Sequence, residues 1–366
     1  MEIICLRENL LKAINQTEKI IGKNFSLPIL NNLYFKTEKG RLKITATNLE
    51  IAISSWVPGK INEEGETTIP AKIISGIISG LSDDKINLRF KDNLLIVKTD
   101  NYQAQINTIN PKEFPLIPKI KSENKIKINQ KILKKHLSRV IKVVSESTIN
   151  SVLSGILVDN KKKEIKFVAT DSFRLAVSIE KKENENEEIS FIIPFRTALE
   201  IIRLSSDKDF DVEINIGENQ AVFIFEQSEI ISRLIEGKFP DYEKIIPNNF
   251  ETKIFLDKND FLKNIKLVGL FSARLGEIKI NPLNDKENLE IKAEENNLGT
   301  NKSVISAQIQ GKTEEVVFNY RYLLDGLDNL EENKIIFSLN GNSGPSYLNS
   351  LNKADYFYLL MPIRNQ

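Results

Sequence analysis

Residues 43–55 read KITATNLEIAISS, and residues 166–179 read KFVATDSFRLAVSI. In both segments an Ala-Thr-Asn or Ala-Thr-Asp motif is flanked by residues that favour strands. Asp171 follows Asn48 by 123 residues (171 minus 48). A period of this length is too long for the unit of a solenoid and suits a whole compact domain. The sequence therefore predicts a chain built from copies of one domain.

Two further motifs recur at nearly the same period. An Ile-Pro pair that precedes an apolar helix pattern recurs once as Ile-Pro and once as Phe-Asn, and a Phe-Pro pair recurs once. The positions are Ile69-Pro70, Ile193-Pro194 and Phe318-Asn319 for the first motif, and Phe114-Pro115 and Phe239-Pro240 for the second. A chain of 366 residues has room for three domains that each bury a core. We therefore expect domains at residues 1–119, 120–247 and 248–366.

Each third alternates strand and helix patterns in the same order. A strand, an amphipathic helix and three strands are followed by the same series again, so each third is predicted to be a doubled β-α-β-β-β unit of the α+β class. The helix stripes predicted to be buried are Leu10, Ile14, Thr17 and Ile21; Ile73, Ile74, Ile77, Ile78 and Leu81; Leu133, Leu137, Val140, Ile141 and Val144; Ala198, Leu199 and Ile202; Phe261, Ile265 and Val268; and Leu323, Leu324, Leu327 and Leu330.

Composition excludes several classes of protein. With 51 basic and 50 acidic residues the chain carries a net charge of only +1, so any polyanion site must be a local feature. A single cysteine, Cys5, cannot form an internal disulfide, and we expect a reducing, cytoplasmic environment. The sequence has neither an apolar run long enough for a membrane span nor the pattern of a signal peptide.

Basic residues gather on two predicted helices. The stretch 131–142, KILKKHLSRVIK, contains five basic residues and no acidic one, and its apolar residues fall on one side, which predicts that the cations face outward. Such stripes bind phosphate backbones without reading bases, although an ordinary solvated helix face remains the alternative. The candidate DNA-binding residues are Lys12, Lys19, Lys23, Lys131, Lys134, Lys135, Arg139 and Lys142.

The sequence contains no recognisable catalytic or metal constellation. His136 is the only histidine and Cys5 the only cysteine, so a His/Cys metal site cannot be assembled. We expect His136 on an exposed, cationic helix face without a nearby carboxylate to orient it, and no nucleotide-binding glycine motif is present. The chain is therefore predicted to be neither an enzyme nor a cofactor-binding protein.

Taken together and in order, the repeat and five segments resemble the bacterial sliding clamp family, the β subunit of DNA polymerase III. The segments are LPILNNL at 27–33, ATDSFRLAV at 169–177, EGKFPDYEKIIP at 236–247, FNYRYLLDGL at 318–327 and the terminal MPIR at 361–364. The resemblance implies three DNA-clamp domains that form half of a closed ring. It also implies a head-to-tail homodimer around duplex DNA that tethers the DNA polymerase III alpha subunit and the clamp loader. Such a clamp confers processivity on the polymerase.

The resemblance also implies a partner-peptide pocket between the second and third domains. An apolar cleft with a few polar anchors suits a short linear peptide. Two features depart from the family pattern: Ser172-Phe173 follows Thr170-Asp171, and Lys244 replaces a usual arginine. The residues carried over are Leu153, Thr170, Phe173, Arg174, Leu175, Pro240, Lys244, Ile245, Asn319, Tyr322, Leu359, Met361, Pro362, Ile363 and Arg364.

The third domain is the least similar to the family. The stretch FSARLGEIKINPLNDKENL at 271–289 matches poorly, and the family's dimer contacts are expected near Leu270 and Leu275. This weaker match keeps one alternative open, a divergent clamp-fold scaffold that binds partners without closing a ring.

Overall fold

The computed structural model describes residues 1–22, 26–117, 124–145, 151–182 and 188–364. Within these residues the order β-α-β-β-β occurs six times, twice in each third, as predicted. The first third contains β1 (Glu2–Leu6), α1 (Arg7–Thr17), β2 (Asn32–Glu38), β3 (Arg41–Thr47), β4 (Ile51–Glu63), β5 (Glu66–Pro70), α2 (Ala71–Gly80), β6 (Lys85–Lys91), β7 (Leu94–Lys98) and β8 (Gln103–Asn107).

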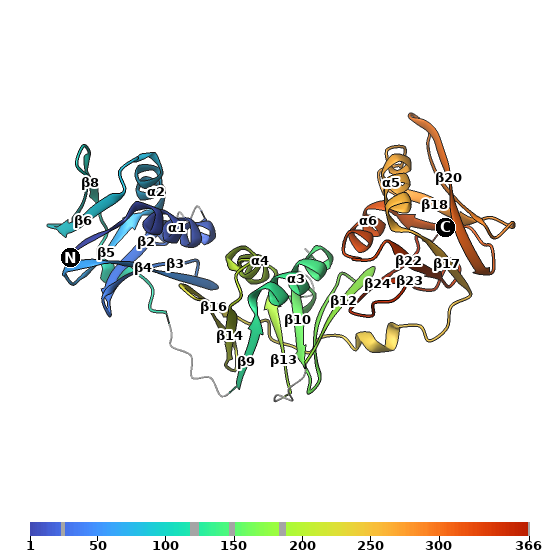
Figure 1. The fold of residues 1–366 in the computed structure, drawn as a ribbon, viewed down its shortest axis with the longest axis horizontal. Coiled ribbons are helices and arrows are strands. Elements are labelled where there is room, and N and C mark those ends of the chain that lie inside the picture. The colour runs from blue at the N-terminus through green and yellow to red at the C-terminus, as the bar shows by residue number, and fades with distance from the viewer. Residues whose placement is uncertain (23–25, 118–123, 146–150, 183–187, 365–366) are drawn as a thin grey trace. The chain divides into compact units, whose positions relative to one another are not determined.

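The other two thirds repeat this series (Figure 1). The middle third contains β9 (Asn124–Asn129), α3 (Gln130–Val140), β10 (Gly155–Asn160), β11 (Glu164–Thr170), β12 (Arg174–Lys181), β13 (Ile189–Pro194), α4 (Phe195–Leu204), β14 (Asp211–Ile216), β15 (Gln220–Ile224) and β16 (Ser228–Arg233). The last third contains β17 (Thr252–Asp257), α5 (Lys258–Gly269), β18 (Glu277–Pro282), β19 (Asn288–Glu295), β20 (Gly299–Gly311), β21 (Val316–Asn319), α6 (Tyr320–Asp328), β22 (Lys334–Leu339), β23 (Ser346–Ser350) and β24 (Tyr356–Leu360).

The chain divides into two compact units. One comprises Met1–Lys134 with Leu199–Leu234, and the other comprises Lys135–Ala198 with Ile235–Gln366. Each unit therefore contains one terminal third and part of the middle third. Each also contains one 12-stranded sheet that continues from one third into the next.

Two strand pairings carry these sheets between thirds. Antiparallel pairing joins β4 to β16 in the first unit, and antiparallel pairing joins β12 to β24 in the second. We call the β4–β16 pairing with its flanking residues the first junction, and the β12–β24 pairing with its flanking residues the second junction. The long strand β4 also pairs with β1 in its own third, so one continuous strand is hydrogen-bonded to strands of two domains.

The predicted helix stripes are largely confirmed. Helix α1 buries Leu10, Ile14 and Thr17 but ends at Thr17, so Ile21 lies beyond it. Helix α5 buries Phe261, Ile265 and Val268 as expected.

Two predicted core positions are exposed, and six more are only half-buried: Ile21, Ile77, Leu81, Ile141, Ile202 and Leu324. Ile73 in α2 is 52% exposed and Leu199 in α4 is 42% exposed. In α2 the buried positions are Ala71, Ile74 and Ile78, a stripe that leaves Ile73 about one residue off the core face. None of the helices described is long and apolar enough to cross a membrane.

Candidate partner pocket and basic helix faces

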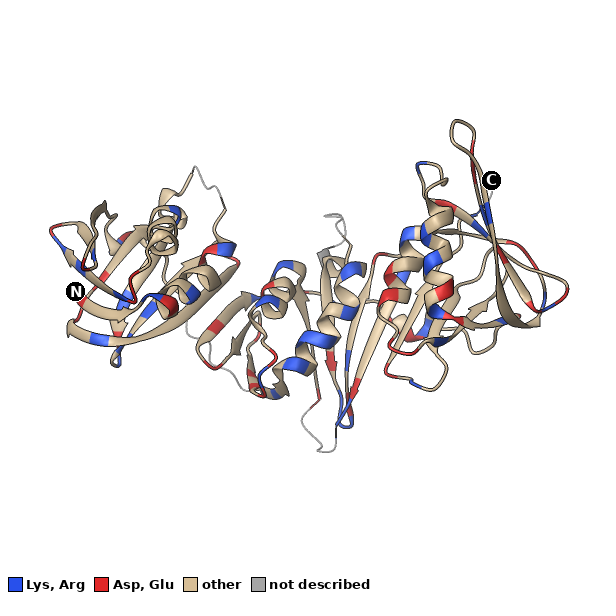
Figure 2. Cartoon of the chain, turned by 45° about the horizontal axis from the view of Figure 1, so that its top comes forward, with Lys and Arg blue, Asp and Glu red and all other residues tan. Residues whose placement is uncertain are grey.

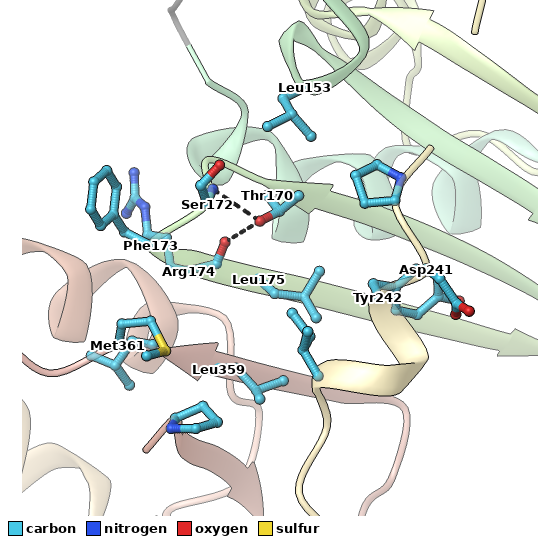
Figure 3. A pocket seen from close by; sticks show the side chains of 14 residues that line it. Leu153, Thr170, Ser172, Phe173, Arg174, Leu175, Asp241, Tyr242, Leu359 and Met361 are labelled. Carbon is cyan, nitrogen blue, oxygen red and sulfur yellow. Dashed lines mark hydrogen bonds between the residues drawn. The ribbon is translucent and has the colours of Figure 1, made fainter. Parts of the chain in front are cut away.

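Two adjoining cavities open beside the second junction. The first has a volume of about 480 Å³ and is lined mainly by apolar side chains, which Figure 3 shows converging from β12, β24 and the segment around Tyr242. The second has a volume of about 510 Å³ and is lined by residues of α6 and the C-terminal tail. Ser172, Phe173 and Met361 line both cavities, so the two form one continuous site.

A tight turn between β11 and β12 forms the wall shared by the cavities. Thr170 Oγ1 donates to the carbonyl of Arg174 over 2.7 Å and accepts from the Ser172 N–H over 3.2 Å. Asp171 Oδ1 accepts from the N–H groups of Phe173 and Arg174, each over 2.9 Å. Ser172 has a φ of +76°, in the left-handed region. The turn leaves the Phe173 ring 62% exposed at the mouth of the site.

The C-terminal tail is docked against this turn. The Met361 N–H donates to the carbonyl of Phe173 over 2.8 Å, and the Ile363 N–H donates to the carbonyl of Val317 over 2.8 Å. The first bond continues the antiparallel pairing of β12 with β24, in which Leu175 faces Leu359, and the second attaches the tail to β21. The tail therefore lines the pocket because the sheet extends into it.

The guanidinium of Arg174 is held on every side. Nε donates to Asp171 over 2.8 Å, Nη1 to Asp325 over 2.7 Å and Nη2 to the carbonyl of Lys142 over 2.8 Å. Its centre lies 4.1 Å from the centroid of the Tyr322 ring. With its donors engaged and its side chain only 10% exposed, Arg174 braces the pocket wall.

The structure brings together the predicted pocket residues with one exception. Lys244 lines neither cavity, is 81% exposed and pairs with Asp241 over 2.8 Å. The neighbouring Ile245 lines the first cavity. Both residues belong to the short helix Tyr242–Ile245, in which consecutive side chains point in different directions.

Sequence reasoning missed several lining residues. Tyr242 is buried in an apolar cluster with Phe239 and Leu359, and burial raises its pKa to about 12. Its position inside the quoted segment EGKFPDYEKIIP was an available signal. Ser172 and Asp241 also lie in quoted segments, ATDSFRLAV and EGKFPDYEKIIP, whereas no motif pointed to Leu275, Pro345 and Leu360.

The basic stripe on α3 differs from the prediction. Helix α3 has basic and no acidic residues (Figure 2). However, Arg139 is only 5% exposed and pairs with Glu331 over 2.6 Å and with Asp355 over 3.0 Å, so its expected outward position is wrong. Amphipathic spacing identified the polar face of α3, which points away from the core of its own domain. It could not show that residues of the last third cover part of that polar face.

Two more cations of this stripe are also paired with the last third. Lys135 lies 2.8 Å from Glu331, and Lys142 lies 3.1 Å from Asp328 and 3.6 Å from Asp325. Hydrogen bonds from Lys135 and Lys353 lower the pKa of Glu331 to about 2. These pairs, together with those of Arg139, form an ion-pair network at the second junction.

The remaining predicted cations are more open to solvent. Lys12 and Lys131 are exposed, and Lys134 lies 3.4 Å from Asp207, whose side chain is 93% exposed. Lys19 lies beyond the end of α1, in the 3₁₀ turn Glu18–Ile20, and its side chain is 60% exposed. Lys23 falls outside the described residues.

His136 also contradicts its prediction, because it is fully buried. Nδ1 lies 2.7 Å from Ser178 Oγ, Nε2 lies 2.9 Å from a carboxylate oxygen of Glu180, and the ring stacks on Phe167 at 5.4 Å. Burial lowers its pKa, and Glu180 opposes that shift. Neither cavity is lined by His136, Ser178 or Glu180. No group of three or more His, Cys, Asp or Glu side chains that could hold a metal ion occurs among the described residues.

Comparison with known families covers nearly the whole chain. Residues 1–118, 127–241 and 243–364 match the N-terminal, central and C-terminal domain models of the DNA polymerase III beta subunit.

Individual relatives are similar over their full lengths. The chain is 26% identical to the beta sliding clamps of Staphylococcus epidermidis and Staphylococcus aureus, with 100% of this chain and 99% of each relative covered. The sliding clamp of Pseudomonas aeruginosa bound to griselimycin superposes with a TM-score of 0.95 at 25% identity, with 100% of both chains covered. The Bacillus subtilis clamp superposes with a TM-score of 0.96 at 24% identity, also with 100% of both chains covered.

Proposed function

Since this chain belongs to the DNA polymerase III beta subunit family, the sliding clamps that make replicative polymerases processive, we propose that two copies close head to tail around duplex DNA. The observation that carries the proposal is the repeat of junctions. In both junctions the fourth strand of one domain pairs with the last strand of the next domain. A third such junction requires a second copy of the chain.

Two strands of the described structure have the positions needed for that third junction. Strand β8 lies at the end of its sheet, and the first half of β20 pairs on one side with β19. Matching the strand registers of the three thirds aligns Ala52 with Thr300 and Ile231 with Gln105. Because Ala52 pairs with Ile231, Gln105 of one copy would lie opposite Thr300 of the partner subunit. Pairing of these two strands between copies satisfies the hydrogen-bonding groups of both sheet edges, which could otherwise pair with other chains and cause aggregation.

Exposed apolar side chains support the same interface. Ile73 of α2 is 52% exposed, and Leu267 and Leu270 at the end of α5 are 48% and 71% exposed. Helices α4 and α1 meet at the first junction, where Arg203 donates to the carbonyls of Asn15 and Gln16. The equivalent helices at the third junction are α2 of one copy and α5 of the other, so burial between copies accounts for these side chains.

A cysteine pair tests both the dimer and its register. The double variant Gln105→Cys with Thr300→Cys should form covalent dimers under mild oxidation, because directly opposed residues of antiparallel strands come within disulfide reach. Gln105→Cys with Asn301→Cys is the matched control, since Asn301 faces the other side of the strand. A monomeric native mass spectrum with no cross-linking would favour the open scaffold.

Enclosure accounts for the charge distribution. A closed ring needs only weak, mobile phosphate contacts to centre the duplex, which agrees with a net charge of +1. We propose Lys12, Lys19, Lys131 and Lys134 as DNA contacts, with Lys135 and Lys142 available when their ion pairs open. The protein should stay on nicked circular DNA after loading by a clamp loader and leave when the circle is linearised. Equal loss from circular and linear DNA would contradict the ring.

The pocket at the second junction is proposed to bind linear peptides of the DNA polymerase III alpha subunit and the clamp loader. Its apolar lining with few polar anchors supports this assignment. Ending the chain at Leu360 should abolish binding of a fluorescein-labelled alpha-subunit peptide while the dimer persists by native mass spectrometry. Unchanged affinity would remove the assignment. The role proposed for the pocket is tethering.

A further inference from the structure

One carboxylate at the second junction connects the pocket wall with a basic residue outside the pocket. Asp325 Oδ2 accepts from Arg174 over 2.7 Å, and Asp325 Oδ1 lies 3.6 Å from Nζ of Lys142. Asp325 lines neither cavity, but Arg174 lines the first and braces Asp171, which holds the turn at Phe173. Asp325 is therefore the second support of the exposed pocket wall.

Lys142 can exchange its anionic partners. Its side chain is 46% exposed and lies between Asp325 and Asp328, whose side chains are 26% and 41% exposed. Ion pairs with this much exposure are weak and open readily. A phosphate group from solvent can replace both carboxylates as the partner of Lys142. By contrast, Arg174 is only 10% exposed and has no such freedom.

Building on the proposed function, we propose that Asp325 positions the pocket wall and that a DNA phosphate on Lys142 strengthens peptide binding through it. In the free protein, Lys142 and Arg174 share the carboxylate of Asp325. When a phosphate group binds Lys142, the ion pair between Lys142 and Asp325 opens. The carboxylate of Asp325 then pairs with Arg174 only, and that ion pair becomes stronger. The stronger pair holds Asp171 and the Phe173 turn more firmly, and an ordered pocket binds peptide with a smaller entropic cost. Linkage then requires that peptide also favours the DNA-bound state.

The experiment measures affinity for a fluorescein-labelled alpha-subunit peptide by anisotropy, with and without a saturating short DNA duplex at constant ionic strength. For the unmodified protein, the duplex should lower the peptide Kd about fivefold, the low end of ordinary coupling between sites. The Lys142→Gln variant should bind the peptide tightly without DNA, because Arg174 is then the only cation paired with Asp325. Its peptide Kd should not change when the duplex is added. A purely structural role of Lys142 predicts weaker binding instead.

Two further variants complete the test. Asp325→Asn should weaken peptide binding under both conditions, and Asp325→Glu should restore part of it. Circular dichroism and thermal unfolding will show whether each variant is folded. Lys353→Gln is the matched control, because it removes a different ion pair at the same junction, with Glu331, and should retain the fivefold response.

Three results would overturn the proposal. These are an unmodified protein whose peptide affinity ignores the duplex, a Lys142→Gln variant that still responds to it, or a folded Asp325→Asn variant with normal affinity. Failure of the pocket assignment is distinguishable, because the unmodified protein would then not bind the peptide under either condition.

Discussion

The two junctions share one backbone design but expose different chemistry. At the first junction Thr47 and Asn48 hold a turn with the same hydrogen bonds that Thr170 and Asp171 make at the second, and Leu49 and Ser172 both have a φ of +76°. An N–H at the end of the last strand donates to a carbonyl of the turn in both cases, from Arg233 to Glu50 and from Met361 to Phe173.

The side chains at these matched positions decide what each junction can bind. The second junction presents Phe173 and Met361, which line apolar cavities, whereas the first presents the exposed charged pair Glu50 and Arg233. Under the proposed function, an apolar peptide surface would be buried against Phe173 and Met361, which Glu50 and Arg233 replace with charge at the first junction. If the pocket binds peptides as proposed, a few side-chain changes in a repeated fold suffice to distinguish one junction from the other.

The largest effect is expected when the second junction is given the residues of the first. Phe173→Glu with Met361→Arg should weaken binding of the alpha-subunit peptide about 100-fold or more, because charged groups replace the apolar walls that anchor it. Isothermal titration calorimetry measures the loss. Glu50→Phe with Arg233→Met is the matched control and should leave the peptide Kd unchanged. A comparable loss in the control would mean that the junctions act together.

A second difference between the junctions is how they are held. Arg139→Met should lower the free energy of unfolding by about 3 kcal/mol, because Glu331 and Asp355 lose a buried partner. Arg203→Met at the first junction should cost only about 1 kcal/mol, since it removes partly exposed bonds to backbone carbonyls. Urea denaturation compares the two variants. Equal losses would show that the ion-pair network adds nothing specific to the second junction.

The second junction should also be the acid-sensitive one. Burial lowers the pKa of His136 from 6.5. Below pH 6.5 the unfolded chain therefore binds a proton more readily than the folded protein does. The free energy of unfolding falls as the pH drops through this range. Glu331 has a pKa lowered from 4.5 to about 2, so its contribution is lost as pH falls from 4.5 toward 2. Glu180, Arg139 and Lys135 surround the imidazole and shape the upper step.

Urea titrations over this pH range measure both steps. His136→Gln should remove the step that begins below pH 6.5 and leave the lower one. If the variant keeps the upper step, another group is responsible, because His136 is the only histidine in the chain.

The smallest effect concerns the shared turn. Leu49→Gly should stabilise the protein by up to about 1 kcal/mol, because a branched side chain is strained at positive φ and glycine is not. Ser172→Gly should give a smaller gain, since serine is less strained there. Thermal unfolding of the two single variants provides the ranking. A destabilised Leu49→Gly variant would mean that the Leu49 side chain, 49% exposed, contributes packing that outweighs its strain.

The sequence predicted what depends on local pattern and recurrence. The Ala-Thr-Asn and Ala-Thr-Asp segments identified the repeat, and they recur because the same turn hydrogen bonds require the same residue types. The pocket was located because its motifs belong to a family. The pairing of Arg139 could not be predicted, since Glu331 lies 192 residues away and helix spacing carries no information about another domain. The burial of His136 was missed for the same reason, because Glu180 lies 44 residues away on β12.

The double role of β4 has a mechanical consequence. Because β4 runs without interruption from its pairing with β1 to its pairing with β16, tension applied along it passes through covalent bonds within the strand. The hydrogen bonds to β16 run perpendicular to that direction, so the load shears several of them together instead of peeling them one by one. Under a pulling force the first junction should yield abruptly and at high force.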